Sequence, residues 1–194
     1  TLLATSLGTV AALGLSRPHM PFKGTLMAIL ISPMIVPLII TSAGMFFFYS
    51  KIGLTHTYLG LILAHTALGT PFVVITVTAT LTGFDTNLIR ASQSLGADTM
   101  RTFFKVIMPL ILPGVISGGL FAFITSFDEV VVVMFIGSVE QITIPKQMWA
   151  GLRQETSPVI LCMATCLVAL SIGLLTTVEM LRRRSERLRG IKQR

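Results

Sequence analysis

Five apolar runs separated by polar intervals dominate the chain, at about residues 1–15, 26–49, 58–81, 109–136 and 158–178. A helix that crosses a bilayer needs about 20 predominantly apolar residues, and four of the runs reach that length. The pattern therefore predicts an all-α, polytopic membrane helix bundle in a single transmembrane domain over residues 1–194. The first run lacks the basic start and the cleavage site of a signal peptide. We interpret it as the end of an incomplete span, which makes five visible spans and six expected in the full chain.

Composition supports this fold class. The chain is 53% hydrophobic and 12% charged, with a mean hydropathy of +0.83, whereas soluble domains carry about 25% charged residues. That difference argues against a water-soluble fold. Cys162 and Cys166 are too few for a disulfide framework or a zinc site, so we expect no metal and assign them to helix packing.

The distribution of basic residues predicts the topology. Lys and Arg are enriched in cytoplasmic loops. Twelve of them fall in the segments around 17–23, 82–108 and 179–194, and three (Lys51, Lys146 and Arg153) fall in the alternate loops. The polar interval 82–108 and the basic tail 179–194 are therefore predicted to be cytoplasmic, and the loop 137–157 external. A net charge of +7 can indicate nucleic acid binding, but there the basic residues lie on a soluble face. A basic tail after an apolar run instead fixes topology and binds anionic lipid.

The polar interval, residues 82–108, has an internal pattern of its own. Leu88, Ala91, Ser92 and Leu95 recur at helical spacing, Asp85 can cap the start of that helix, and Gly96 can end it in a left-handed conformation. Asp98 can cap a second short helix, Thr99 to Met108, and Pro109 suits the first residue of the next span. The expected product is a helix–turn–helix shaped to dock into another protein.

The sequence of this interval resembles a known motif. Residues 90–109, RASQSLGADTMRTFFKVIMP, are similar to the EAA loop of bacterial ABC-importer permeases: Glu-Ala-Ala, three residues, Gly, nine residues, Ile-x-Leu-Pro. Ala91, Gly96 and Pro109 match with the spacing intact. Ser92, Val106 and Met108 replace Ala, Ile and Leu, and Arg90 stands where the motif has Glu.

Two further segments, residues 110–136 and 142–160, are similar to the spermidine/putrescine branch of the same permeases. The resemblance implies a bacterial inner membrane protein that forms half of a transmembrane pair with a second, different permease subunit. It also implies two ATPase subunits, which hold ATP and Mg²⁺, and a periplasmic solute-binding protein. No cofactor is expected on this chain. By position, the ATPase-coupling residues would be Ala91, Ser92, Leu95, Gly96, Ala97 and Asp98.

Two adjacent acids interrupt the fourth run. Asp128 and Glu129 lie inside or at the outer end of that span, where an acid near a helix centre costs about 2.5–3.5 kcal/mol. Such residues mark a substrate path, although hydrated acids at headgroup depth are the alternative. Adjacent helix positions point about 100° apart. We therefore include both acids in the candidate substrate path: Asp128 is preferred for the pore, with Ser126 and then Thr125 in support, and Glu129 is expected to contact the partner subunit.

Other features carry weaker signals. Gly114, Gly118 and Gly119 predict close helix packing, either within the subunit or against the partner permease. The prolines at 33, 37 and 71 favour kinks. The external loop 137–157 is long enough for a short helix on the membrane surface that serves as a platform for the binding protein, with Trp149 as an interfacial anchor.

Alternative functions fit less well. An intramembrane serine protease would need a Gly-x-Ser-Gly turn, which Ser117 lacks, and a base within about 3 Å of the serine. An ion channel would need a pore loop or a charged filter. The chain has no Walker motif, so it is predicted not to be an enzyme, with ATP hydrolysis on another subunit. The same machinery importing an opine, amino acid, phosphonate, sulfate or ferric iron remains open.

Overall fold

Helices account for all of the secondary structure in the part of the chain that the structure describes. The computed structural model describes residues 1–194 except 18–19, 86, 155–157 and 189–194, so the end of the predicted basic tail lies outside the described residues. The elements are α1 (Leu2–Leu15), α2 (Lys23–Ile35), α3 (Leu38–Lys51), α4 (Tyr58–Thr82), α5 (Asn87–Ser94), α6 (Thr99–Thr102), a π-helical segment (Phe103–Ile107), α7 (Met108–Phe127), α8 (Val131–Ile136), α9 (Ile144–Gln154) and α10 (Pro158–Leu188).

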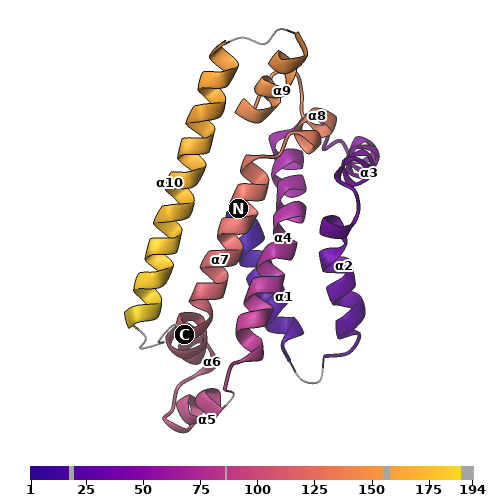
Figure 1. Ribbon diagram of the computed structural model, residues 1–194. Coiled ribbons are helices and arrows are strands. Elements are labelled where there is room, and N and C mark those ends of the chain that lie inside the picture. The colour runs from indigo at the N-terminus through magenta and orange to yellow at the C-terminus, as the bar shows by residue number, and fades with distance from the viewer. Residues whose placement is uncertain (18–19, 86, 155–157, 189–194) are drawn as a thin grey trace.

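Figure 1 shows α1, α4 and α7 side by side at the centre, with α2 and α3 on one side and α10 on the other. Helices α5 and α6 lie at one end of the bundle and α8 and α9 at the opposite end. Three described helical segments are long and apolar enough to cross a membrane: Tyr58–Thr82, Thr99–Phe127 and Pro158–Thr177. The all-α membrane fold predicted from the sequence is confirmed.

The second apolar run does not form one straight span. We predicted a single span over 26–49, but α2 and α3 meet at an angle of 106°. Val36 is extended, with φ −72° and ψ 136°, because the ring of Pro37 disfavours the helical conformation in the residue before it and removes a backbone N–H. The kink expected at Pro37 is therefore a complete break between two helices.

The fourth span differs from its prediction at both ends. α6, the π-helical segment and α7 form one continuous helix from Thr99 to Phe127, 29 residues long, so no new helix starts at Pro109. The missing N–H of Pro109 falls in the first two positions of α7, directly after the π-helical segment. At the other end α7 stops at Phe127 rather than continuing to 136, and a separate short helix, α8, follows.

Glycines determine how closely the central helices approach. A Cβ atom on Gly114 would meet the hydroxyl of Thr80, and one on Gly118 would meet the backbone of Val73; both neighbours belong to α4. Gly119 faces α1, where a Cβ would lie 3.0 Å from Thr5 Oγ1. Of the two interpretations of these glycines, the structure supports packing within the subunit.

An apolar cluster joins α3, α4 and α8. It consists of Tyr49, Ala64, Leu68, Val132 and Ile136. α10 packs differently: it contacts α7 and α9, yet no residue of its apolar window is buried. Cys162 and Cys166 are free and exposed on this helix, so the helix packing assigned to them does not occur within the described part of the chain.

Candidate functional site

Two groups of polar residues, at opposite ends of the central helices, are candidates for function. The first is the polar interval. Asp85 Oδ1 accepts a hydrogen bond of 2.9 Å from the backbone N–H of Asn87 at the start of α5. Gly96 has φ +81°, the left-handed conformation expected there. Asp98 Oδ1 accepts a bond of 2.6 Å from the N–H of Arg101, so both predicted caps are present.

A hydroxyl pair joins the two helices of this interval. Ser92 Oγ lies 2.9 Å from Thr102 Oγ1, across the turn, and Ser92 Oγ also donates to the carbonyl oxygen of Ile89 at 2.9 Å. Thr102 is buried. Of the predicted coupling residues, Ser92 therefore points inward and connects α5 to α6. Thr102 could not be recognised from the sequence, since a threonine four residues after a capping Asp gives no signal of burial.

The remaining predicted coupling residues lie on the surface. Ala91, Gly96 and Asp98 are exposed, and Ala97 is half-buried. Leu95 is 88% exposed and Met100 is 66% exposed. Two large apolar side chains so open to solvent, one on each side of the turn at Gly96, form a surface suited to contact with another protein.

The acids at the opposite end of α7 occupy a turn between two helices rather than the interior of a span. Asp128 ends α7, with φ −91° and ψ 1°, and it is exposed. Glu129 is buried, and its Oε1 accepts a hydrogen bond of 2.8 Å from the backbone N–H of Val132 in the first turn of α8. The two carboxylates therefore have different surroundings: one is open to solvent and the other stabilises a helix start.

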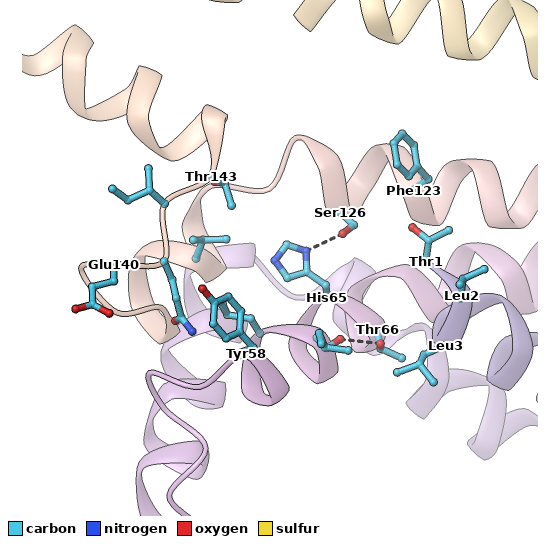
Figure 2. A pocket seen from close by; sticks show the side chains of 15 residues that line it. Thr1, Leu2, Leu3, Tyr58, His65, Thr66, Phe123, Ser126, Glu140 and Thr143 are labelled. Atoms are coloured by element: carbon cyan, nitrogen blue, oxygen red, sulfur yellow. Dashed lines mark hydrogen bonds between the residues drawn. The ribbon is translucent and has the colours of Figure 1, made fainter.

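The second group of polar residues centres on a histidine. Ser126 Oγ of α7 lies 3.0 Å from His65 Nδ1 of α4, and both side chains line a cavity of about 710 Å³. We call it the His65 cavity; its fifteen lining residues come from the start of α1, from α4, α7 and α8, and from the segment 140–143. Figure 2 shows the second ring nitrogen of His65 directed away from Ser126.

The structure brings only one of the predicted path residues into this cavity. Ser126 lines it, whereas Thr125, Asp128 and Glu129 do not. His65 was not among the path residues predicted from the sequence. The signal was present, because an imidazole inside an apolar run indicates a functional position. His65 contacts Ser126 rather than Ser117, the serine considered for a protease. Ile124 and Phe127 occupy the two positions around Ser126 where the Gly-x-Ser-Gly turn would need glycine.

The loop that closes this end is held by a lysine. Lys146 Nζ donates to the carbonyl oxygens of Ser138 and Gln141, both at 3.1 Å. The helix expected within 137–157 is present as α9, and Trp149 on it is 46% exposed. The side chain of Arg153 lies outside the described residues.

Comparison with known proteins finds one matching family model and related permease sequences. The family model for the inner membrane component of binding-protein-dependent transport systems matches residues 4–187. The chain is 30% identical over 183 residues to the spermidine/putrescine transport system permease protein PotC of Haemophilus influenzae, an alignment that covers 94% of this chain and 71% of that protein. It is 28% identical over 202 residues to the putrescine transport system permease protein PotI of Escherichia coli, an alignment that covers 98% of this chain and 71% of that protein.

Among solved structures, the MetNI methionine ABC transporter in inward-facing conformations matches with a TM-score of 0.70 and 22% identity. The match covers 99% of this chain and 89% of that chain. At that identity the similarity shows a shared fold.

Proposed function

The chain belongs to the family of inner membrane components of binding-protein-dependent transport systems, and we propose that it imports polyamines such as putrescine or spermidine. It does so as the membrane-spanning permease subunit of an ATP-driven ABC importer, where it forms half of the translocation path. The family match and the named PotC and PotI relatives support this reading. A permease subunit is not itself an enzyme; in this proposal ATP and Mg²⁺ are bound and ATP is hydrolysed on partner subunits.

The assembly we propose has four kinds of component. This chain pairs with a second, different permease subunit; two ATPase subunits bind on the cytoplasmic side, and a periplasmic solute-binding protein docks on the other. The polar interval and the C-terminus then face the cytoplasm, and α8 and α9 face the periplasm. The basic segments predicted to be cytoplasmic and the position of α8 and α9 at the end opposite α5 and α6 support this orientation.

The observation that carries the coupling role is the exposed apolar turn of the polar interval. Leu95 is 88% exposed beside Gly96, and the helix that follows the turn runs without a break from Thr99 to Phe127. A displacement of the turn by an ATPase is therefore transmitted along one helix to the opposite end of the bundle. Alternating access follows if that movement opens one end of the path as it closes the other.

The cation path in this proposal passes Asp128. Its exposed carboxylate attracts ammonium groups by Coulomb interaction, whereas the carboxylate of Glu129 is buried and accepts a backbone hydrogen bond. Ser126 and Thr125 precede Asp128 on the last turn of α7. We therefore keep Asp128 as the first path residue, with Ser126 and Thr125 behind it.

The test is transport by the complete assembly in proteoliposomes, containing the full-length chain, its partner permease, the ATPases and the binding protein. We expect ATP-dependent putrescine uptake, and we expect Gly96→Asp to abolish uptake while the chain still inserts and ATP is still hydrolysed. Wild-type uptake by Gly96→Asp would refute the coupling role. ATP-dependent import of an opine, amino acid, phosphonate, sulfate or ferric iron instead of polyamine would refute the substrate, and ATP-independent flux would indicate a channel.

A further inference from the structure

We propose that the His65 cavity is a subsite for an alkyl ammonium group, with His65 as its hydrogen-bond acceptor. The solute class rests on the proposed function, but the subsite itself rests on the geometry of the cavity. Ligand sites for small molecules occupy about 300–1,000 Å³, and this cavity measures about 710 Å³.

The lining chemistry favours a cation. Its polar side chains include the neutral groups of Tyr58, His65 and Ser126 and the carboxylate of Glu140, and no lysine or arginine lines the cavity within the described residues. Lys146, which lies beside the wall segment 140–143 in the sequence, directs its Nζ at two backbone carbonyl oxygens. Among the described side chains that line this cavity, a positively charged solute therefore meets one acid and no base.

The hydrogen bond between the two helices defines the acceptor. His65 Nδ1 lies 3.0 Å from Ser126 Oγ, and the other ring nitrogen, Nε2, is directed away from that contact (Figure 2). A neutral imidazole has one N–H donor and one bare acceptor nitrogen. An ammonium group, which has donors only, selects the tautomer in which Nδ1–H donates to Ser126 and Nε2 accepts.

Apolar and aromatic groups complete the subsite. Leu61 and Ile62 of α4 and Val133 of α8 line the cavity and suit the methylene groups of an alkyl amine. Tyr58 also lines the cavity, and an aromatic face attracts a cation within about 6 Å of its centre. An α,ω-diamine carries a second ammonium group, for which the carboxylate of Glu140 in the cavity wall is the partner.

This subsite overlaps only in part with the path assigned to Asp128, since neither Asp128 nor Glu129 lines the cavity. Ser126 belongs to both. In this proposal Tyr58, His65 and Glu140 join the residues that contact solute at this end of the bundle. His65 makes the most specific contact, because it provides the hydrogen-bond acceptor for the ammonium group.

The test is equilibrium binding of radiolabelled putrescine to the membrane complex of both permeases and both ATPases in nanodiscs, without binding protein. We expect His65→Leu, which removes the acceptor, to weaken binding at least tenfold. His65→Gln retains an acceptor oxygen and is expected to stay within threefold of wild type. His56→Asn is the matched control, because His56 lies outside the cavity and asparagine tolerates its φ of +61°.

Assembly of each variant is checked by size-exclusion chromatography and thermal unfolding, so that loss of binding is not mistaken for loss of fold. No putrescine binding by the wild-type complex, or equal binding by wild type and a folded His65→Leu variant, would overturn the subsite. Uptake by the complete transporter is measured in parallel. Binding that depends on His65 without ATP-driven putrescine uptake would refute the proposed function and leave the subsite standing.

Discussion

A Cβ atom on Gly118 of α7 would lie 2.7 Å from the Cα atom of Val73 of α4. A backbone atom cannot move aside as a flexible side chain can, so the two helices are in backbone contact at this point. The same face of α7 carries Gly114, opposite Thr80. These contacts make α4 and α7 a tightly packed pair that supports both candidate sites, one at each end.

Substituting Gly118 with alanine tests this contact. We expect Gly118→Ala to destabilise the folded permease by about 1–3 kcal/mol, the range for overpacking a well-packed core, and to lower the midpoint of thermal unfolding in detergent. Gly173→Ala on α10 is the control, because a Cβ there meets nothing within 4 Å. Equal midpoints for the two variants would contradict the close approach of α4 and α7.

The left-handed turn of the polar interval gives a second prediction. Gly96→Ala places a side chain at φ +81°, which costs about 1–2 kcal/mol, so we expect slower uptake per ATP hydrolysed with normal insertion. Gly83→Ala is the matched control: Gly83 has φ −92° and open space around it. Uptake and phosphate release are measured together in proteoliposomes, and an unchanged ratio in Gly96→Ala would show that the turn geometry is not required for coupling.

The Ser92–Thr102 contact predicts that α5 and α6 loosen when it is removed. Ser92→Ala is expected to destabilise the interval by about 0.5–1.5 kcal/mol, the net value of a typical hydrogen bond, and to increase hydrogen exchange of α5 amides. Ser94→Ala is the control, because Ser94 donates only to the carbonyl of Arg90 on the exposed face. Should both serine variants exchange at the wild-type rate, the contact does not hold the helices together.

Glu129 is expected to act through hydrogen bonding rather than through charge. Glu129→Gln retains an oxygen that can accept from the Val132 N–H, so its stability should stay close to wild type. Glu129→Leu loses that acceptor, and we expect a loss of about 0.5–2 kcal/mol, as for other helix-start acceptors. Thermal unfolding of the two variants separates these roles; a large loss in Glu129→Gln would assign the contribution to the charge.

Asp128 is expected to act through charge. Asp128→Asn keeps the size of the side chain but removes the attraction for ammonium groups. We expect slower putrescine uptake with unchanged thermal stability, since Asp128 is exposed. The uptake rate of Glu140→Gln, which removes the carboxylate that lines the His65 cavity, is measured in the same assay for comparison. If putrescine uptake by Asp128→Asn equals that of wild type, Asp128 is not part of the path.

The sequence alone predicted the fold class and the local features of the polar interval. Asp85, Gly96 and Asp98 are short-range signals, because a cap or a left-handed turn depends on neighbouring residues only. Pro37 indicated that the second apolar run would bend at this point. Hydropathy, however, measures only how apolar a run is. It does not distinguish a kinked span from two helices at 106°.

The His65–Ser126 pair could not be predicted, because the two residues are 61 positions apart and meet only once α4 packs on α7. The glycines that bring these helices together were identified, but their partners Val73 and Thr80 are ordinary residues of an apolar run. Similarly, the difference between exposed Asp128 and buried Glu129 arises from the end of α7 at Phe127. The two acids mark an interruption of the apolar run, but hydropathy does not show which of them is buried.

The continuous helix from Thr99 to Phe127 gives the polar interval a long lever arm. With a rise of about 1.5 Å per residue, Ser126 lies about 29 Å along the axis from Ile107 at the end of the π-helical segment. If α4 and α7 tilt together by about 5°, that arm moves the His65–Ser126 pair by about 2.5 Å relative to α9. The 3.0 Å contact within the pair is kept while the gap between the pair and Thr143 changes width. Such a rotation at the polar interval would therefore change the size of the His65 cavity at the opposite end of the bundle while the His65–Ser126 contact stays intact.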